Sequence, residues 1–70
     1  MLTLRKLAKT LEKDDKILIY DGGTLVETVM AGEIQKSEDN FYTLSVVRVL
    51  ELEEDGTFLA RIGEDTNSKE

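Results

Sequence analysis

The first hydrophobic pattern in the chain repeats at the spacing of a helix. Apolar side chains recur at intervals of three and four residues, at Leu4, Leu7, Ala8 and Leu11. This spacing places them on one face of a helix. Thr3 is a suitable N-cap, and Leu2 before it can pack against Leu7. The pattern predicts an amphipathic helix over residues 4–13.

Two runs of β-favouring apolar residues follow, at residues 17–20 and 24–30, and the triplet Asp21, Gly22 and Gly23 lies between them. A phosphate-binding loop would carry its glycines between a strand and the N-terminus of a helix. Here the residues after the triplet are typical of a strand. Glycine supplies positive φ at a turn, and an aspartate side chain can bond to nearby backbone N–H groups. We therefore interpret the triplet as the turn of a β-hairpin.

The centre of the chain is polar, and the part after it is again β-like. Residues 31–40 contain one large aliphatic side chain, Ile34, and are expected to be a connection that places this residue in the core. Residues 41–53 form the longest β-type run, and residues 57–62 are its partner across a turn. Residues 64–70 contain no apolar side chain, which predicts a frayed tail.

The register of this second hairpin can be derived from its two faces. A two-residue turn would mix polar and apolar side chains on both faces of the pair. A three-residue loop with Gly56 in the left-handed conformation sorts them better, because it pairs Leu52 with Phe58 and Leu50 with Ala60. We therefore expect the face turned toward the helix to carry Leu50, Leu52, Phe58, Ala60 and Ile62.

These elements predict an α+β fold with a single compact domain over residues 1–63. Each element is apolar on one side, and a helix laid across one face of a sheet buries both apolar surfaces. We expect one N-terminal amphipathic helix packed on a four-stranded, mainly antiparallel sheet made of two β-hairpins. The pattern does not fix the order of the two hairpins within the sheet.

The composition excludes several classes of chemistry. The 70 residues include no cysteine and no histidine, which removes disulfides, cysteine or histidine zinc sites, catalytic triads and imidazole acid–base catalysis. We therefore expect a protein that is not an enzyme and that holds no metal or cofactor. The lack of cysteine and of a signal-like N-terminus favours the cytoplasm. No membrane span is expected, because no apolar run approaches the roughly 18–20 residues needed to cross a bilayer.

Charge is distributed unevenly along the chain. The net charge is −6, yet residues 1–16 carry five cations and three anions, whereas residues 17–70 carry four cations and twelve anions. The densest acidic cluster falls on the second hairpin, at Glu51, Glu53, Glu54 and Asp55. Such a cluster keeps a sheet edge soluble, or it forms a surface that binds a partner. Both interpretations stay open.

The predicted helix also carries a basic strip opposite its apolar face. At about 100° per residue, four cations share this exposed side: Arg5, Lys6, Lys9 and Lys13. The strip is able to contact phosphates or an acidic protein partner. A plain solvated helix face is the simpler interpretation, because four charges are few and the net charge of the chain repels nucleic acid.

Two charged residues interrupt the apolar strands, Glu27 in the second run and Arg48 in the longest one. An inward-facing charge needs a partner, so one hypothesis is that the two residues form a buried ion pair. The alternative is that each lies in water at the rim of the sheet. Tyr20 and Tyr42 are candidate interface anchors, because tyrosine suits sites that are dry at one end and wet at the other; packing in the core or at the rim of the sheet is the simpler interpretation.

The opening hydrophobic pattern, Leu4-x-x-Leu7-x-x-x-Leu11 running into residues 16–21, and the later Asp55-Gly56 hairpin together resemble short uncharacterised proteins encoded by phages and prophages of Gram-positive bacteria. The resemblance covers the start of the chain and the last hairpin. It rests on hydrophobic pattern and not on catalytic residues. It implies a compact accessory protein that acts by binding something in the host.

The sequence supports four hypotheses about function. The first is a non-enzymatic protein-interaction module, in its most concrete form a phage-type inhibitor of a host nucleic-acid enzyme or defence complex that presents carboxylates in place of phosphates. The second is a nucleic-acid-binding module that uses the basic helix strip. The third is a small enzyme or metabolite-binding protein centred on Glu27 and Arg48. The fourth is a homodimer formed through a free sheet edge.

Overall fold

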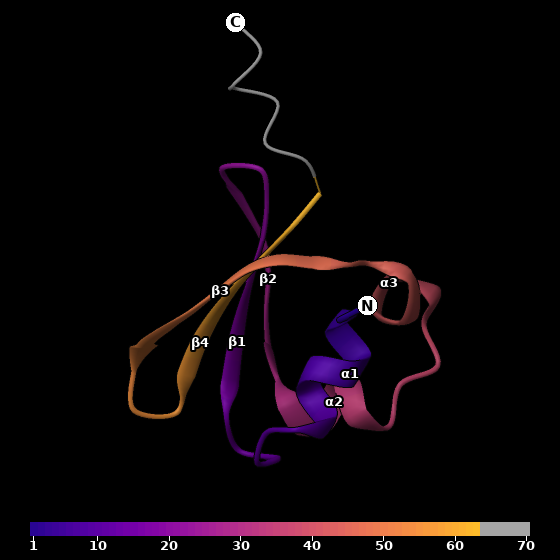
Figure 1. The fold of residues 1–70 in the computed structure, drawn as a ribbon. Coiled ribbons are helices and arrows are strands. Elements are labelled where there is room, and N and C mark those ends of the chain that lie inside the picture. Colours follow the sequence, from indigo (N-terminus) through magenta and orange to yellow (C-terminus); the bar gives the residue numbers. More distant parts are fainter. Residues whose placement is uncertain (64–70) are drawn as a thin grey trace, which may run out of the picture.

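The computed structural model describes residues 1–63, which form three short helices and four strands (Figure 1). In chain order the elements are α1 (Leu4–Lys9), β1 (Lys16–Asp21), β2 (Thr24–Met30), α2 (Ala31–Gln35), α3 (Asn40–Leu44), β3 (Val47–Glu54) and β4 (Thr57–Ile62). The predicted α+β class and both predicted hairpins are confirmed. The tail expected at residues 64–70 lies outside the described residues.

The four strands form one sheet in the order β2-β1-β4-β3. Each hairpin is antiparallel, but the hairpins meet through β1 and β4, which run parallel with Lys16 opposite Thr57 and Asp21 opposite Ile62. The expectation of a mainly antiparallel sheet is therefore corrected to a mixed sheet. The parallel pair lies at the centre, and on the helix side it supplies the most deeply buried side chains of the sheet.

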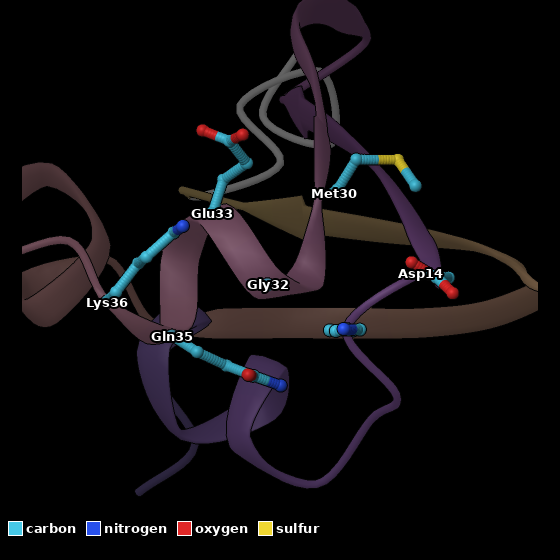
Figure 2. Close-up of a pocket in the computed structure, with 7 residues that line it drawn as sticks. Asp14, Met30, Gly32, Glu33, Gln35 and Lys36 are labelled. Atoms are coloured by element: carbon cyan, nitrogen blue, oxygen red, sulfur yellow. The ribbon is translucent and has the colours of Figure 1, made fainter.

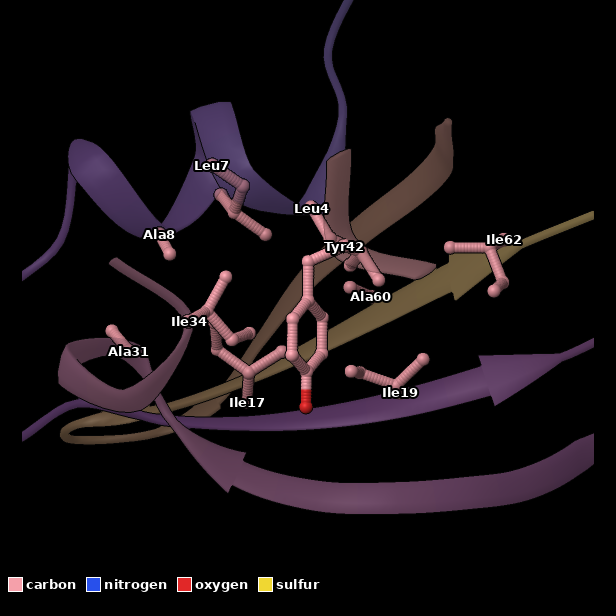
Figure 3. Packing of buried hydrophobic residues seen from close by; sticks show 10 residues of the cluster. All are labelled: Leu4, Leu7, Ala8, Ile17, Ile19, Ala31, Ile34, Tyr42, Ala60 and Ile62. Carbon is pink, nitrogen blue, oxygen red and sulfur yellow. The ribbon is translucent and has the colours of Figure 1, made fainter. Parts of the chain in front are cut away.

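All three helices lie on the same side of the sheet, so the single helix expected from the sequence is one of three (Figure 1). The core lies between the helices and this face (Figure 3). Its members are each at most 9% exposed: Leu4, Leu7, Ala8, Ile17, Ile19, Ala31, Ile34, Tyr42, Ala60 and Ile62. None of the helices in residues 1–63 is long and apolar enough to span a membrane.

The N-terminal helix α1 is shorter than expected. It begins after Thr3, whose hydroxyl oxygen accepts from a backbone N–H of the first turn at 3.2 Å, so the predicted N-cap is confirmed. It ends at Lys9 and not at residue 13. The hydroxyl of Thr10 donates to the Leu7 carbonyl oxygen at 2.7 Å. Such a side-chain bond competes with the backbone ladder, and the helix stops there.

A side chain from α2 completes the end of α1. The Nε2 of Gln35 donates to the carbonyl oxygen of Ala8 at 2.8 Å and to that of Leu11 at 3.1 Å. The Ala8 carbonyl also accepts from the Leu11 N–H at 3.1 Å. Gln35 therefore adds a second donor at Ala8 and supplies one at Leu11, from 24 to 27 positions further along the chain. The contact ties α1 to α2 and holds Leu11, just beyond the helix, against the core.

The segment expected to be an irregular connection, residues 31–40, contains α2 and the start of α3. Ile34 is fully buried, as predicted. The strand predicted to begin at residue 41 begins instead at Val47, because the preceding residues form α3. Asp39 favours this helix, since its side chain accepts from the Phe41 N–H at 2.9 Å and caps the first turn.

The first hairpin confirms the interpretation of Asp21, Gly22 and Gly23 as a turn. Asp21 pairs with Thr24 across the turn, and β2 follows directly without an intervening helix. Gly22 has a φ of 69°, a left-handed conformation that glycine adopts without steric cost. The triplet therefore turns the chain, as predicted.

The pairing predicted for the body of the second hairpin is confirmed, but the three-residue loop is corrected: Glu54 pairs with Thr57 across a two-residue Asp55–Gly56 turn, and a register irregularity between Leu52 and Glu54 restores the predicted faces. Leu52 pairs with Phe58 and Leu50 pairs with Ala60. Gly56 has a φ of 75°, which is the left-handed conformation expected of it. Because Leu50 and Leu52 share the helix side with Ala60, strand alternation places Val49 and Glu51 on the side of the sheet that the helices leave open.

Candidate functional site

The acidic cluster of the second hairpin lies at one edge of the sheet. Glu51, Glu53 and Glu54 are on β3 and Asp55 is in the turn, and all four are exposed. We call these four residues the acidic edge. β3 is the outermost strand on its side of the sheet, and Figure 1 shows its hairpin extending away from the helices. Within residues 1–63 no three acidic side chains lie close enough together to hold a metal ion.

Two exposed leucines alternate with these carboxylates along β3. Leu50 is 42% exposed and Leu52 is 63% exposed, and Phe58, opposite Leu52, is half-buried. We call these three residues the apolar strip. They share the helix-facing side of the sheet with Ala60, as the sequence predicts. Ala60 and Ile62 are buried beneath the helices, whereas the apolar strip is left largely uncovered.

The exposure of the apolar strip follows from the lengths of the elements. The six residues of α1 span about 9 Å at 1.5 Å per residue. The eight residues of β3 span about 26 Å at 3.3 Å per residue. The helices therefore cover one end of the long hairpin and leave its tip free. Alternation in the sequence identifies the face on which each residue lies, but it does not show how far along the hairpin the helices cover that face.

The outer side of β3 is occupied only at its start. Residues 2–4 lie beside residues 45–47, and the Val47 N–H donates to the Leu2 carbonyl oxygen at 2.8 Å. In the part of the chain that the structure describes, no segment pairs with the outer side of residues 48–54. The backbone groups of this stretch are therefore open to another strand.

Glu27 points toward the helix-facing side of the sheet. It lies opposite Ile19 on β1, and its carboxylate accepts from the Tyr42 hydroxyl at 2.7 Å. Figure 3 shows the Tyr42 ring within the core cluster. Burial, this hydrogen bond and the negative charges of Glu27, Asp39 and Glu33 raise the pKa of Tyr42 to about 12. Tyr42 is therefore a neutral donor at physiological pH, and the contact joins α3 to β2.

The structure does not bring Glu27 and Arg48 together. They lie on β2 and β3, at opposite edges of the sheet with two strands between them. At about 4.8 Å per strand this separates their backbones by roughly 14 Å. The hypothesis of a buried ion pair is therefore corrected, because Glu27 bonds to Tyr42. Arg48 is exposed and lines a shallow hollow with Phe41 and Leu44.

The basic strip is dispersed in the structure. Lys6 and Lys9 are exposed on α1, but Lys13 lies beyond the end of the helix and Arg5 is half-buried. Lys13 instead lines an open hollow beside α2 in which Glu33 contributes an opposing charge (Figure 2). The four cations therefore do not share a single helix face.

The two candidate tyrosine anchors have different surroundings. Tyr42 belongs to the core and is 9% exposed. Tyr20 is half-buried and lies beside Arg61 on β4. Its neighbour Ile19 is fully buried on the helix side, so strand alternation places Tyr20 on the opposite, uncovered side of the sheet. Of the two, Tyr20 alone stays available to a partner.

The chain matches no protein-family model, no curated protein and no solved structure. A function can therefore be assigned only from the chemistry of the surface. The acidic edge and the apolar strip are the two sequence-predicted features that the structure brings together, on one free edge strand. What sequence reasoning missed is that the leucines between the carboxylates are exposed.

Proposed function

We propose that the protein is a non-enzymatic protein-interaction module that docks a larger partner through its β3–β4 hairpin. The observation that carries the proposal is the alternation of exposed Leu50 and Leu52 with exposed Glu51 and Glu53 along one edge strand. Solvated charge alone would explain the glutamates. It does not explain the two exposed leucines on the other face of the same strand, and exposed apolar side chains bordered by polar ones are typical of interaction sites.

The chemistry of the hairpin defines the kind of partner. Four carboxylates lie within residues 51–55, in a chain with a net charge of −6. A cationic surface is attracted to such a cluster, and the attraction accelerates association. A surface that ordinarily binds nucleic-acid phosphates meets this requirement. The most concrete form of the proposal is therefore an inhibitor of a nucleic-acid enzyme or defence complex, of the phage type that the sequence resemblance implies.

Nucleic-acid binding through α1 has weaker support. Of the four cations expected to share one helix face, Lys6 and Lys9 are exposed on the helix itself. The net negative charge of the chain opposes approach to a phosphate backbone. This alternative makes a different prediction about nuclease treatment, which separates it from the proposal.

The experiment is affinity capture from a bacterial lysate with a C-terminally tagged chain, with and without nuclease treatment and at low and moderate salt. The test variant is Glu53→Lys/Glu54→Lys. The matched control is Glu33→Lys/Glu38→Lys, which changes the net charge equally at exposed residues on and after α2. We expect a discrete protein that is retained by the wild type and the control and lost by the test variant. Higher salt should weaken the complex.

Two results would contradict the proposal. Equal capture by Glu53→Lys/Glu54→Lys and the wild type would remove the acidic edge from the binding surface. Material that disappears on nuclease treatment and on Lys9→Glu substitution would assign binding to α1 and nucleic acid. A mobility shift with short DNA and RNA at low salt would then identify the ligand class.

A further inference from the structure

We infer that the partner contributes a β-strand, which pairs with the outer side of β3 along residues 48–54 and alternates basic with apolar side chains. The inference rests on the proposed function and specifies how the partner is recognised. Addition of a strand to an exposed sheet edge is a recurring mode of recognition, in which the backbone supplies affinity and alternate side chains supply specificity. Three properties of β3 support it here.

The first property is a free edge next to a strand contact that the chain already makes. Residues 2–4 lie along the outer side of β3 at residues 45–47. Among residues 1–63 nothing continues this line beside residues 48–54. An incoming strand would therefore lie next to an existing backbone contact, beyond the irregularity between Val47 and Val49.

The second property is the separation of apolar and acidic side chains onto two faces of the strand. Leu50 and Leu52 lie on the helix-facing side, opposite Ala60 and Phe58. Glu51, between them in the sequence, lies on the other side by strand alternation. Side chains directly opposite on paired strands lie about 4.5–5.5 Å apart. A partner strand with apolar residues on one face and lysine or arginine on the other complements both the apolar and the acidic face of β3.

The third property is that β3 disfavours pairing with the β3 strand of a second copy. Pairing of two copies of β3 would place their acidic side chains close together, and like charges on paired strands are destabilising. The strand also has register irregularities between Val47 and Val49 and between Leu52 and Glu54. The charges protect the edge from self-pairing, whereas the irregularities limit its regular part to residues 49–52. The occupant that fits is therefore a basic strand of a different protein.

The other free edge supplies a control surface. β2 exposes Leu25 and Val26 at 47% and 48%, similar to the leucines of β3. Its one carboxylate, Glu27, is bonded to Tyr42, so β2 lacks the exposed acidic row. Binding that depends on hydrophobic exposure alone would use both edges, whereas the inference requires β3.

The test uses a synthetic peptide that alternates lysine with valine over the length of residues 48–54, titrated into the full chain by calorimetry or fluorescence anisotropy. One control peptide has the same composition, with lysines and valines in two blocks. A second has the same sequence with every backbone amide N-methylated, which prevents strand pairing but keeps the side chains. We expect the unmodified alternating peptide to bind on the order of tenfold more tightly than either control.

Two pairs of protein variants locate the site. Glu51→Lys/Glu54→Lys should lower the affinity for the alternating peptide by on the order of tenfold. Glu33→Lys/Glu38→Lys should lower this affinity much less. Leu50→Ser/Leu52→Ser should also lower the affinity for the peptide, whereas Leu25→Ser/Val26→Ser on β2 should leave the affinity unchanged. The serine variants change exposed residues, and far-ultraviolet circular dichroism checks that each protein is folded.

Equal binding of the N-methylated and unmodified peptides would overturn the inference, as would absence of binding at low salt or equal losses from the β2 and β3 variants. Self-association through β3, seen as a concentration-dependent mass that Leu50→Ser/Leu52→Ser abolishes, would also overturn it. These failures are distinguishable from failure of the proposed function. If Glu53→Lys/Glu54→Lys abolishes capture of the natural partner while the peptide does not bind, the hairpin docks through side chains alone.

Discussion

The hydroxyl of Tyr42 donates a hydrogen bond of 2.7 Å to the carboxylate of Glu27. The bond joins α3 to the edge strand β2 across 15 positions of sequence. It occupies a carboxylate that would otherwise be the best candidate for chemistry on the helix-facing side of the sheet. The pair is therefore a structural contact, and it leaves the β3–β4 hairpin as the surface that requires a functional explanation.

Tyr42→Phe should lower the free energy of unfolding by about 1–2 kcal/mol, because it removes a hydrogen bond to a charged group that is partly buried. The ring and its core contacts are kept. Tyr20→Phe is the matched control, since the Tyr20 hydroxyl makes no hydrogen bond within residues 1–63, and it should change stability by less than about 0.5 kcal/mol. Urea denaturation measures both. Equal effects would show that the bond to Glu27 contributes nothing.

Alkaline pH should weaken the fold through the same residue. The pKa of Tyr42 is about 12 in the folded chain, against an ordinary value of 10.0. The folded state holds this proton more tightly, so the contribution of Tyr42 is complete below pH 10 and is lost as the pH rises from about 10 to about 12. In Tyr20→Phe, which leaves Tyr42 as the only tyrosine, tyrosinate absorbance should titrate near 12 when folded. A midpoint near 10 would contradict this.

The first hairpin illustrates what local sequence can predict. β1 and β2 are rich in β-favouring residues, and glycines lie between them. All of these signals come from consecutive residues, so the sequence predicts the hairpin, and the structure confirms it. Helices α2 and α3 were not predicted. Each has only five residues, too few for a periodic pattern. The one available signal was Asp39 as an N-cap before Phe41.

Features that join distant parts of the chain could not be derived in this way. The parallel pairing of β1 with β4 depends on how two hairpins meet, and neither hairpin encodes it. The same is true of the contact between Tyr42 and Glu27. For the candidate site, the sequence identified the acidic edge and the face of each leucine. The exposure of Leu50 and Leu52 depends on where the helices end.

The two glycines of the first turn should respond differently to alanine. Gly22 has a φ of 69°, and a Cβ atom there meets no neighbour within 4 Å, so the cost of Gly22→Ala is conformational. We expect a loss of about 1–2 kcal/mol. Gly23 has equal space without a left-handed φ, and Gly23→Ala should be neutral or stabilising by up to about 1 kcal/mol. Thermal unfolding of both variants tests this, and similar losses would contradict the turn geometry.

Gln35→Met should destabilise the fold by about 1–2 kcal/mol. The substitution keeps the length of the side chain but removes the amide that donates to the carbonyl oxygens of Ala8 and Leu11. The Ala8 carbonyl keeps the Leu11 N–H, so the cost arises from the two lost hydrogen bonds and from the Leu11 carbonyl, which loses its donor. Lys36→Met is the control at the next, exposed position. Chemical denaturation compares the two. If both variants were equally stable, the α1–α2 contact would have no energetic role.

Alanine substitutions should distinguish the core from the apolar strip. Ile34 is fully buried, and Ile34→Ala should cost about 2–5 kcal/mol through lost burial and a residual cavity. Leu52 is 63% exposed, and Leu52→Ala should cost less than about 1 kcal/mol. Denaturation midpoints give both values. A large loss at Leu52 would mean that the hairpin tip is packed and unavailable to a partner.

The most direct test of the central claim is backbone amide hydrogen exchange across residues 1–63, with and without the alternating lysine–valine peptide. Strand addition at β3 predicts slower exchange within residues 48–54 and no change within residues 24–30 of β2. The N-methylated peptide should leave both segments unchanged. Protection of β2 in place of β3, or no protection by a peptide shown to bind, would contradict the assignment of the β3 edge as the docking surface.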